Sequence, residues 1–366
     1  MIVPRHTLEI DPGAIRANAA RLVELVGPAE LWAVVKADGY GHGAALAAQA
    51  ALAGGATRLA CSTLAEAHDL RDAVGPLPRV LVLAPLGEGE ERSAEGFEIA
   101  VSSLRALRRL QASAVRCGVH VKADTGMGRW GLSAADAITA GSLVAADPNL
   151  ELHGLMSHLA TADEADTVFT AEQGAAFARI AERFPTCPRH LANSAAALFH
   201  PALRLDAVRC GIALYGISPD GGDPGRFGLR PAMRWTSRVH ALKDLPAGAS
   251  AGYGRRLVAD GPTRIALVPV GYADGYPRRA SGRSDVLISG ARRRVAATVS
   301  MDQLSCIVDD AVEVGDEVTL IGEQGGERIA AEELARAAQT IGYEVVCAIG
   351  AAAPRRGSVV AQAPQS

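Results

Sequence analysis

Residues 31–43, LWAVVKADGYGHG, join an unbroken apolar run to a lysine and then to a glycine-rich turn. The run has no polar alternation, so it is typical of a strand that is covered on both faces, as in a parallel sheet. Lys36 ends this strand, and the glycines that follow allow the backbone to turn sharply. The sequence therefore predicts a buried strand that ends in an ammonium group.

Apolar runs of the same kind recur along the chain, with helix-like stretches between them. The helix before the first run has Asp11 as its N-cap, Pro12 at its first position and Gly27-Pro28 as its stop. The later runs are RLACS (58–62), RVLVLAP (79–85), EIAVS (98–102), GVHVKAD (118–124), LELHGLMSH (150–158), RHLANS (189–194) and LDAVRCGIALYG (205–216). Eight such strands alternating with helices predict a (β/α)8 barrel, with a doubly wound open sheet as the alternative.

The pattern changes near Arg230-Pro231. Short, often alternating segments follow, punctuated by Gly, Pro and Asp: RWTSRVHALKDL (234–245), TRIALVPVGYA (263–273), DVLISGARRRVAATV (285–299), LSCIVDD (304–310) and DEVTLIG (316–322). One amphipathic helix, AAEELARAAQTIG (330–342), interrupts them before YEVVCAIG (343–350). We predict a barrel over residues 1–230 and a β-rich domain over 231–366, while a first strand within residues 1–10 could join either.

Composition narrows the class of protein. The 366 residues are 49% hydrophobic and 21% charged, and the net charge of −3 offers no basic excess for nucleic acid or membrane surfaces. The longest uncharged stretch, Gly43 to Thr57, is shorter than the roughly 20 apolar residues that span a bilayer. No basic start followed by an apolar core begins the sequence, and the six cysteines form no C-x-x-C pair. We expect a cytoplasmic protein without disulfides or a metal site.

The lysine at position 36 has a chemical interpretation and a structural one. A lysine at a strand end can simply extend its charged head to solvent. In a barrel, however, chemistry takes place at the carboxyl ends of the strands, where Lys36 is expected. A partly desolvated lysine has a lowered pKa and attacks carbonyl groups, which is what a Schiff base with an aldehyde cofactor requires.

Eight segments carry a resemblance to a known family. AVVKADGYGHG (33–43) resembles the pyridoxal-phosphate (PLP) lysine motif of alanine racemases. Seven further segments resemble the family's other signatures in the same order: VKADTGMGRWG (121–131), MSHLATAD (156–163), ANSAAAL (192–198), VRCGIALYG (208–216), AGYGRR (251–256), VGYADGYPRR (270–279) and SMDQ (300–303). The resemblance covers nearly the whole chain. It implies a PLP-binding barrel with a carboxy-terminal β domain, acting as a homodimer that interconverts L-alanine and D-alanine to supply peptidoglycan synthesis.

The resemblance implies that two bases act on opposite faces of the substrate. Lys36 is one, and Tyr253, which the partner subunit contributes in this family, is the other. Free lysine and tyrosine have pKa values near 10, so both values must fall for work at neutral pH. Arg255 and Arg256 follow Tyr253 and could lower its pKa.

The resemblance also assigns contacts to the cofactor, to Lys36, Tyr40, His158, Asn193, Ser194, Arg209, Gly211 and Ile212. Arg209 would face the pyridine nitrogen, supported by His158. Because a guanidinium cannot accept a proton, the ring nitrogen would stay unprotonated and the ring would be a weaker electron sink. Ser194 and Tyr40 would supply hydroxyls to the phosphate, while Asn193 could instead cap a helix.

Substrate contacts are implied on both parts of the chain. Arg129 corresponds to the arginine that holds the substrate carboxylate, for which a two-pronged guanidinium is well suited. Met301, Asp302 and Tyr272 lie at the matching edge of the second domain. Lys122 aligns with a lysine that is often carbamylated in this family, and the carbamate would then hold Arg129.

The chain departs from the family's pattern near its end. Where the family typically has Ser-Tyr-Arg-Val-Pro-Arg, this sequence has GAAAPRR (350–356), with Ala351 at the tyrosine position. One hydroxyl near the phosphate would be missing and one wall of the pocket would be shorter. We predict a roomier site that handles serine better than usual, with alanine as the main substrate.

Three other functions compete with a racemase. GMGRWG (126–131) fits the G-x-G-x-x-G pattern of an NAD-dependent dehydrogenase, although Arg129 and Trp130 place bulk where a pyrophosphate should approach the backbone. An amino-acid decarboxylase on the same barrel would need a cysteine or acidic group opposite the substrate, and no matching motif is found. A PLP-binding protein without catalysis would need neither Arg129, Tyr253 nor a second domain.

Overall fold

The computed structural model describes residues 4–353 and 359–362. Eight parallel strands form a closed barrel: β2 (Glu30–Val34), β3 (Arg58–Cys61), β4 (Arg79–Val82), β5 (Glu98–Val101), β6 (Cys117–Lys122), β7 (Leu150–Met156), β8 (Arg189–His190) and β9 (Ala207–Cys210). Because β2 pairs with both β3 and β9, the sheet closes on itself. The predicted barrel is confirmed, and the open sheet is excluded.

Helices surround the barrel: α1 (Pro12–Val26), α3 (Ala44–Ala53), α4 (Leu64–Val74), α5 (Leu104–Ser113), α6 (Ala134–Ala145), α7 (Val168–Ala181) and the short α8 (Ser194–Phe199). The first begins as the sequence predicts, since the Asp11 side chain accepts a hydrogen bond from the Ala14 amide at 3.0 Å. Gly27, with a φ of 68°, ends it. Short 3-10 turns occupy Glu91–Ala94, Pro201–Leu203, Ile212–Tyr215 (η3) and Pro224–Phe227.

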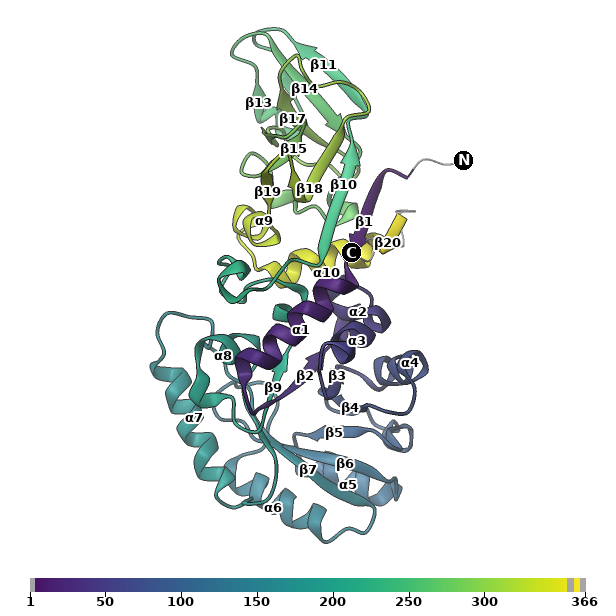
Figure 1. Ribbon diagram of the computed structural model, residues 1–366, viewed down its shortest axis with the longest axis vertical. Coiled ribbons are helices and arrows are strands. Elements are labelled where there is room, and N and C mark those ends of the chain that lie inside the picture. The colour runs from purple at the N-terminus through teal and green to yellow at the C-terminus, as the bar shows by residue number, and fades with distance from the viewer. Residues whose placement is uncertain (1–3, 354–358, 363–366) are drawn as a thin grey trace.

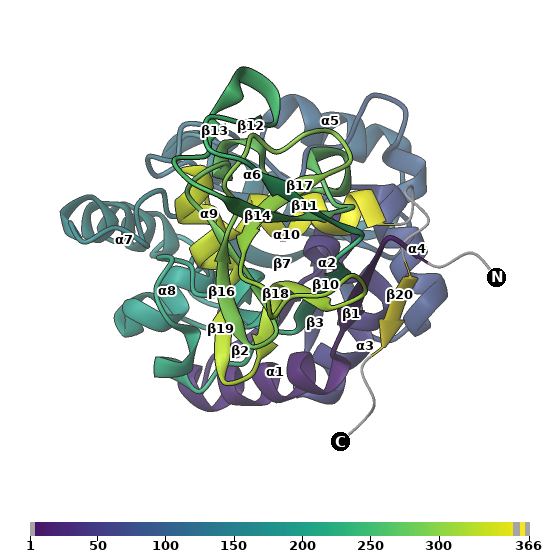
Figure 2. The ribbon, with the colours of Figure 1, turned by 90° about the horizontal axis from the view of Figure 1, so that it is seen from above.

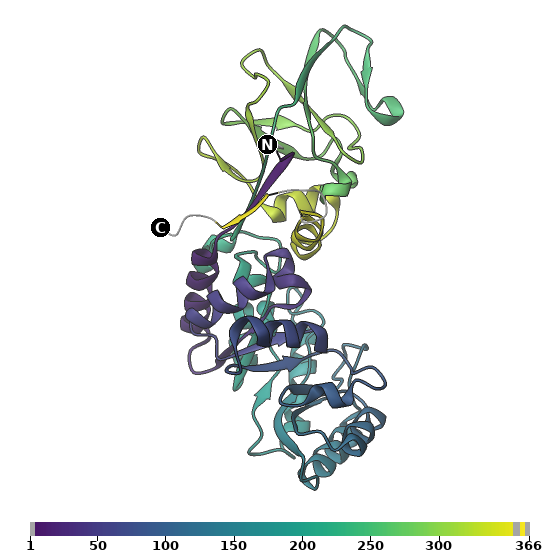
Figure 3. The same cartoon turned by 90° about the vertical axis from the view of Figure 1, so that its right-hand side faces the viewer.

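A seven-stranded sheet forms the core of the β-rich part. Its order is β16-β15-β18-β10-β1-β20, with β19 paired to β18. Its members are β1 (His6–Ile10), β10 (Met233–Arg238), β15 (Asp285–Ile288), β16 (Ala291–Arg294), β18 (Glu317–Gln324), β19 (Glu327–Ile329) and β20 (Val359–Gln362). The first strand pairs with β10 and β20, so it belongs to this sheet and not to the barrel (Figure 3). The division of the chain at residue 230 stays a prediction.

Smaller elements complete this part. A three-stranded sheet contains β11 (Ala241–Leu245), β14 (Thr263–Val268) and β17 (Leu304–Val308), and a two-stranded one contains β12 (Ser250–Ala251) and β13 (Leu257–Val258). Three 3-10 turns lie at Tyr253–Arg255, Tyr272–Asp274 and Arg278–Ala280. The strands predicted from alternation in residues 234–322 are therefore present.

Two helices, α9 (Ala331–Ala338) and α10 (Gly342–Ala352), lie between the barrel and the sheet (Figure 1). The second is a correction, because YEVVCAIG was expected to resume β structure. Seen from above, the strands of the β-rich part lie over α10 and the barrel (Figure 2). A Cβ atom at Gly41 would lie 2.4 Å from the carbonyl oxygen of Val346, so α10 packs backbone to backbone against the turn that follows Lys36. That contact requires glycine.

Within residues 4–353 and 359–362, no helix is long and apolar enough to span a membrane. The same ranges contain no cluster of three or more His, Cys, Asp or Glu side chains arranged to hold a metal ion. All six cysteines are free, and Cys347 alone among them is partly exposed.

Candidate active site

Lys36 begins a left-handed turn and does not end the strand, which corrects the prediction from sequence. β2 stops at Val34, and α2 (Lys36–Gly41) has φ values of 53°, 51°, 61° and 55° at Ala37, Asp38, Gly39 and Tyr40. Each non-glycine residue in this conformation costs about 1–2 kcal/mol. A turn this strained persists only where its surroundings hold it, as is common at functional sites.

Side chains from neighbouring elements hold this turn. Glu66 of α4 accepts a hydrogen bond from the Ala37 amide at 2.8 Å, and Asp38 accepts one from the Ala44 amide at 2.8 Å. The buried ring of His42 stacks on that of Tyr215 at 4.4 Å between centroids. As a result, Lys36 and Tyr40, four residues apart, line the same cavity.

This cavity has a volume of about 440 Å³ and lies at the carboxyl ends of the barrel strands. It gathers every site residue that the sequence predicted within the barrel: Lys36, Tyr40, Lys122, Arg129, His158, Asn193, Ser194, Arg209, Gly211 and Ile212. They come from segments that follow or end β2, β6, β7, β8 and β9, as expected of a barrel enzyme. We call it the Lys36 cavity.

One end of the Lys36 cavity is built to receive an anion. Ser194 Oγ accepts hydrogen bonds from the amides of Gly211 at 3.0 Å and Ala213 at 3.4 Å, so its own hydrogen remains to be donated. A Cβ atom at Gly211 would lie 2.3 Å from the hydroxyl oxygen of Tyr40, so only glycine lets that hydroxyl approach. Asn193 caps α8 by accepting from the Ala196 amide at 3.0 Å, which favours the capping role.

At the other end, Arg209 begins a directional chain of hydrogen bonds through the barrel interior. Its Nη1 lies 2.7 Å from Nδ1 of His190, whose Nε2 lies 2.8 Å from Nδ1 of His120, whose Nε2 lies 2.9 Å from Oε2 of Glu98. Because arginine only donates, His190 must accept through Nδ1 and donate through Nε2. His120 must then donate to Glu98. Both tautomers follow from this polarity.

Burial and charge agree with neutral imidazoles in this chain. Burial lowers the pKa of His190 well below its ordinary value, and burial also lowers that of His120. Burial by itself would raise the pKa of Glu98, but hydrogen bonds from His120 and His153 and the charge of Arg58 lower it well below its usual range. Glu98 is therefore a buried anion at neutral pH, paired with Arg58 at 2.8 Å, and it ends the chain that begins at Arg209.

The Lys36 cavity has an excess of positive groups. Burial lowers the pKa of Lys36, and the charge of Arg129 lowers it further. Burial, followed by the charges of Arg209, Arg129 and Lys36, lowers the pKa of Lys122 to about 8. Burial and the same neighbours lower the pKa of His158 to about 3, with its Nδ1 lying 3.3 Å from Nη2 of Arg209. Such a site favours ligands that carry carboxylate or phosphate groups.

The sequence pattern did not indicate that two side chains of α10 line the Lys36 cavity. Tyr343 and Cys347 lie one turn apart on α10 and face the cavity, and the ring of Tyr343 lies 6.1 Å from that of Tyr40. Their i, i+4 spacing is the signal that would have found them had the segment been interpreted as a helix. Ala351, one turn further along the same face, is exposed and does not line the cavity.

The four site residues predicted in the β-rich part do not reach the Lys36 cavity. These are Tyr253, Tyr272, Met301 and Asp302. All are exposed, with 71% of Tyr253 and 51% of Met301 accessible. Arg255, expected to act on Tyr253, donates to the hydroxyl of Ser250 at 3.0 Å. Within one chain, therefore, no second base faces Lys36 from this group.

Comparison with known proteins places the chain in a well-defined group. It matches the family described as "Alanine racemase, N-terminal domain" over residues 10–219 and "Alanine racemase, C-terminal domain" over residues 232–357. An alanine racemase of Symbiobacterium thermophilum is 42% identical over 360 residues, covering 95% of each chain. One of Frankia casuarinae is 43% identical over 368 residues, covering 96% of each.

Solved structures agree with these matches. The crystal structure of alanine racemase from E. faecalis superposes with a TM-score of 0.91 at 33% identity, over 99% of this chain and 100% of the other. That of Bartonella henselae alanine racemase, with covalently bound pyridoxal phosphate, superposes with a TM-score of 0.89 at 26% identity, over 99% and 100%.

Proposed function

The chain belongs to the alanine racemase family, and from this premise we propose that it interconverts L-alanine and D-alanine with Lys36 and the partner subunit's Tyr253 as the two bases. The observation that carries the proposal is the Lys36 cavity, in which ten predicted residues from five strand ends converge. Membership in the family makes the protein a PLP-dependent racemase. The assignment of roles to its residues is ours.

The Lys36 cavity fits pyridoxal phosphate. Lys36, with its lowered pKa, would hold the aldehyde covalently. The hydroxyls of Ser194 and Tyr40 and the amide of Ile212 would hold the phosphate, with Gly211 positioning Ser194 through its own amide and leaving room for Tyr40. Arg209 would face the ring nitrogen as a donor. When bound, the cofactor supplies an electron sink for the negative charge left at Cα after proton removal.

The protein's own groups would then orient the substrate and move its proton. Lys36 takes or returns the Cα proton on one face, and the partner subunit's Tyr253 does so on the other. Arg129 would pair with the substrate carboxylate, and a carbamate on Lys122 would orient Arg129. The Arg209–His190–His120–Glu98 chain holds the guanidinium of Arg209 in place. Because arginine donates a hydrogen bond but keeps its proton, the ring nitrogen would stay unprotonated.

We propose a homodimer in which each site is completed by the other subunit. The support is the exposure of Tyr253 together with that of Tyr272, Met301 and Asp302, which are the residues that the family resemblance assigns to the substrate side. Exposed side chains of this kind on one domain and an incomplete site on the other suit a two-fold assembly.

The cellular role belongs to the same proposal. We place the enzyme in the cytoplasm, supplying D-alanine for peptidoglycan, with some activity toward serine. Ala351 itself does not line the Lys36 cavity, so its effect would come from the absence of a side chain long enough to reach the cavity from α10. The six free cysteines suit a reducing compartment.

The direct test follows both products of proton exchange. The purified holoenzyme is incubated with L-alanine in deuterium oxide, while D-alanine formation and Cα deuteration are measured over time. Both should appear together, and Lys36→Ala should abolish both. Borohydride reduction followed by peptide mass mapping should place the cofactor on Lys36. A colourless protein that leaves L-alanine unchanged after addition of the cofactor would refute the proposal.

A further inference from the structure

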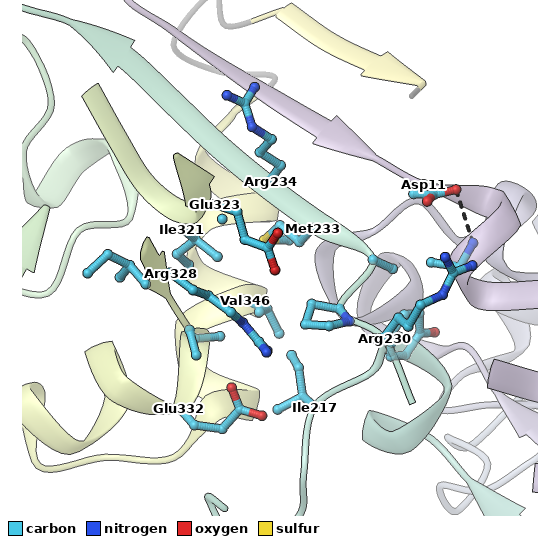
Figure 4. Close-up of a pocket in the computed structure, with 18 of the residues that line it drawn as sticks. Asp11, Ile217, Arg230, Met233, Arg234, Ile321, Glu323, Arg328, Glu332 and Val346 are labelled. Atoms are coloured by element: carbon cyan, nitrogen blue, oxygen red, sulfur yellow. Dashed lines mark hydrogen bonds between the residues drawn. The ribbon is translucent and has the colours of Figure 1, made fainter. Parts of the chain in front are cut away.

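A second cavity lies at the junction between the barrel and the seven-stranded sheet. Its volume is about 530 Å³, and it has no lining residue in common with the Lys36 cavity. We call it the junction cavity. Much of its wall is apolar and comes from Ile217, Leu229, Pro231, Met233, Ile321 and Val346. Arg328, Glu323 and Glu332 direct their charged ends toward its middle (Figure 4).

Two charged side chains in this wall, Glu332 and Arg328, each have one buried atom without a hydrogen-bond partner. Glu332 is only 3% exposed, and its Oε1 accepts from the Ser218 amide at 2.9 Å. Among the residues that the structure describes, neither its Oε2 nor Nη2 of Arg328 has a partner, although both atoms are inaccessible to solvent. The other terminal nitrogen of Arg328, Nη1, lies 3.9 Å from Oδ1 of Asp223. A buried polar atom left without a hydrogen bond costs about 1–3 kcal/mol, so a native protein normally provides a partner for it.

Oε2 of Glu332 and Nη2 of Arg328 need hydrogen-bond partners of opposite kinds. A carboxylate oxygen only accepts hydrogen bonds and a guanidinium nitrogen only donates them. A simple cation would be repelled by Arg328, and a simple anion by Glu332 and Glu323. A ligand with one donating cation and one accepting anion satisfies both, and an apolar body would match the remaining wall.

We propose that the junction cavity binds a small zwitterion, an α-amino acid or dipeptide with apolar side chains. Its ammonium group donates to Oε2 of Glu332, and its carboxylate accepts from Nη2 of Arg328. Burial raises the pKa of the Glu332 carboxyl, while the Ser218 amide and the charges of Arg328 and Arg336 offset part of that rise. This site is additional to the proposed racemase site and does not depend on it.

An occupant would touch elements that also build the Lys36 cavity. Val346 lines the junction cavity from α10, the helix that carries Tyr343 and Cys347 on its other side. Tyr215 lines it from the end of η3, which begins with Ile212. Both α10 and η3 therefore contribute residues to each cavity, although no single residue lines both.

The test is calorimetric titration of the holoenzyme with L-leucine and, separately, with L-leucyl-L-leucine. Each titration is repeated after borohydride reduction, so that the probe cannot react with the cofactor in the Lys36 cavity. We expect one saturable site per chain for at least one probe, and the tighter probe identifies the ligand's size. N-acetyl-L-leucine, which lacks the ammonium, and L-leucinamide, which lacks the carboxylate, should each bind about ten-fold more weakly or worse.

Three variants locate the site. Glu332→Gln keeps an oxygen that accepts from the Ser218 amide and replaces only Oε2, the atom without a partner. Arg328→Met removes the guanidinium that would donate to the ligand's carboxylate. Each should weaken binding about ten-fold or more. Glu333→Gln, the neighbour that pairs with Arg292 at 2.6 Å, is the control and should bind as the parent does. The proposal is overturned if neither probe binds saturably, or if binding is equally tight in Glu332→Gln and Arg328→Met.

Discussion

Arg209 donates to the imidazole of His190 across 2.7 Å, and this contact fixes the tautomer of every group behind it. His190→Asn keeps an acceptor near Arg209, whereas His190→Leu, of similar volume, removes it. We expect the leucine variant to be less stable than the asparagine variant by about 1–3 kcal/mol, because it leaves a buried donor unsatisfied. The leucine variant should also shift the visible absorption band of the bound cofactor further from that of the parent than the asparagine variant does. Urea unfolding and absorption spectra of the two holoenzymes provide the comparison. Equal unfolding free energies and identical spectra would show that the hydrogen bond to His190 does not hold Arg209.

Glu98 should make stability depend on pH in the acid range. Its pKa in the folded protein lies well below the unfolded value of about 4.3, so its stabilising contribution is complete above that value. The contribution is lost as pH falls below about 4.3 toward the folded pKa. The unfolding free energy of the parent should thus fall more steeply from pH 5 to pH 3 than that of Glu98→Gln. The variant should also be less stable at pH 7 by about 3–5 kcal/mol, because His153 and Arg58 lose their buried partner. Parallel slopes in the two proteins would contradict this.

Lys122 should react with carbon dioxide more readily as pH rises. Its pKa of about 8 lies below the value of about 10.4 for a free lysine, so the neutral amine that forms a carbamate becomes abundant near pH 8. With ¹³C-bicarbonate, a carbamate signal should grow between pH 7 and pH 9 and be absent from Lys122→Arg. The same lowered pKa favours folding as pH rises from about 8 to 10.4, because the unfolded chain then binds more protons. A signal that persists in Lys122→Arg would assign the carbamate elsewhere.

Tyr253 and Lys36 should complement each other between subunits. Lys36→Ala and Tyr253→Phe are each expected to lose nearly all activity when assayed alone. In a mixed dimer, one of the two sites has both residues intact, so random exchange should restore about a quarter of the parent's activity. Activity after mixing and subunit exchange is the measurement. If the two inactive variants remain inactive after verified exchange, the bases do not come from different chains.

Ala351 should influence the choice between alanine and serine. Ala351→Tyr restores the residue that is usual in the family, and we expect the ratio of kcat/KM for alanine over serine to rise by up to about ten-fold. Ala352→Tyr, the next residue on α10, provides a control at a different helical face. An unchanged ratio in Ala351→Tyr would show that the alanine does not widen substrate choice.

Much of this architecture can be predicted from the order of apolar runs. Each predicted strand of the barrel is present, and most of them have the apolar sequence that a strand covered on both faces needs. The exception is β8, whose two residues are Arg189 and His190. The strand ends then bring Lys122, His158 and Arg209 to one cavity without any knowledge of contacts. The helix at Asp11 followed from capping chemistry alone.

Other features depend on tertiary contacts that no local pattern contains. The left-handed turn at Ala37 and Asp38 violates local preference and exists because Glu66 and α10 hold it. The segment YEVVCAIG is rich in residues that suit strands, yet it is helical because α10 packs on Gly41. His120 and His190 are seventy residues apart, and only the register of the barrel strands puts them in contact.

The position of β1 bears on how the chain is made. This strand leaves the ribosome before the barrel strands do, but both of its neighbours in the sheet, β10 and β20, are synthesised more than two hundred residues later. Its unpaired edges must wait through most of translation, when the barrel that follows it can already close. Stalled or shortened translation products should thus expose the unpaired edges of β1, which can pair with strands of other chains and cause aggregation. The nascent chain is therefore expected to need a chaperone at that stage.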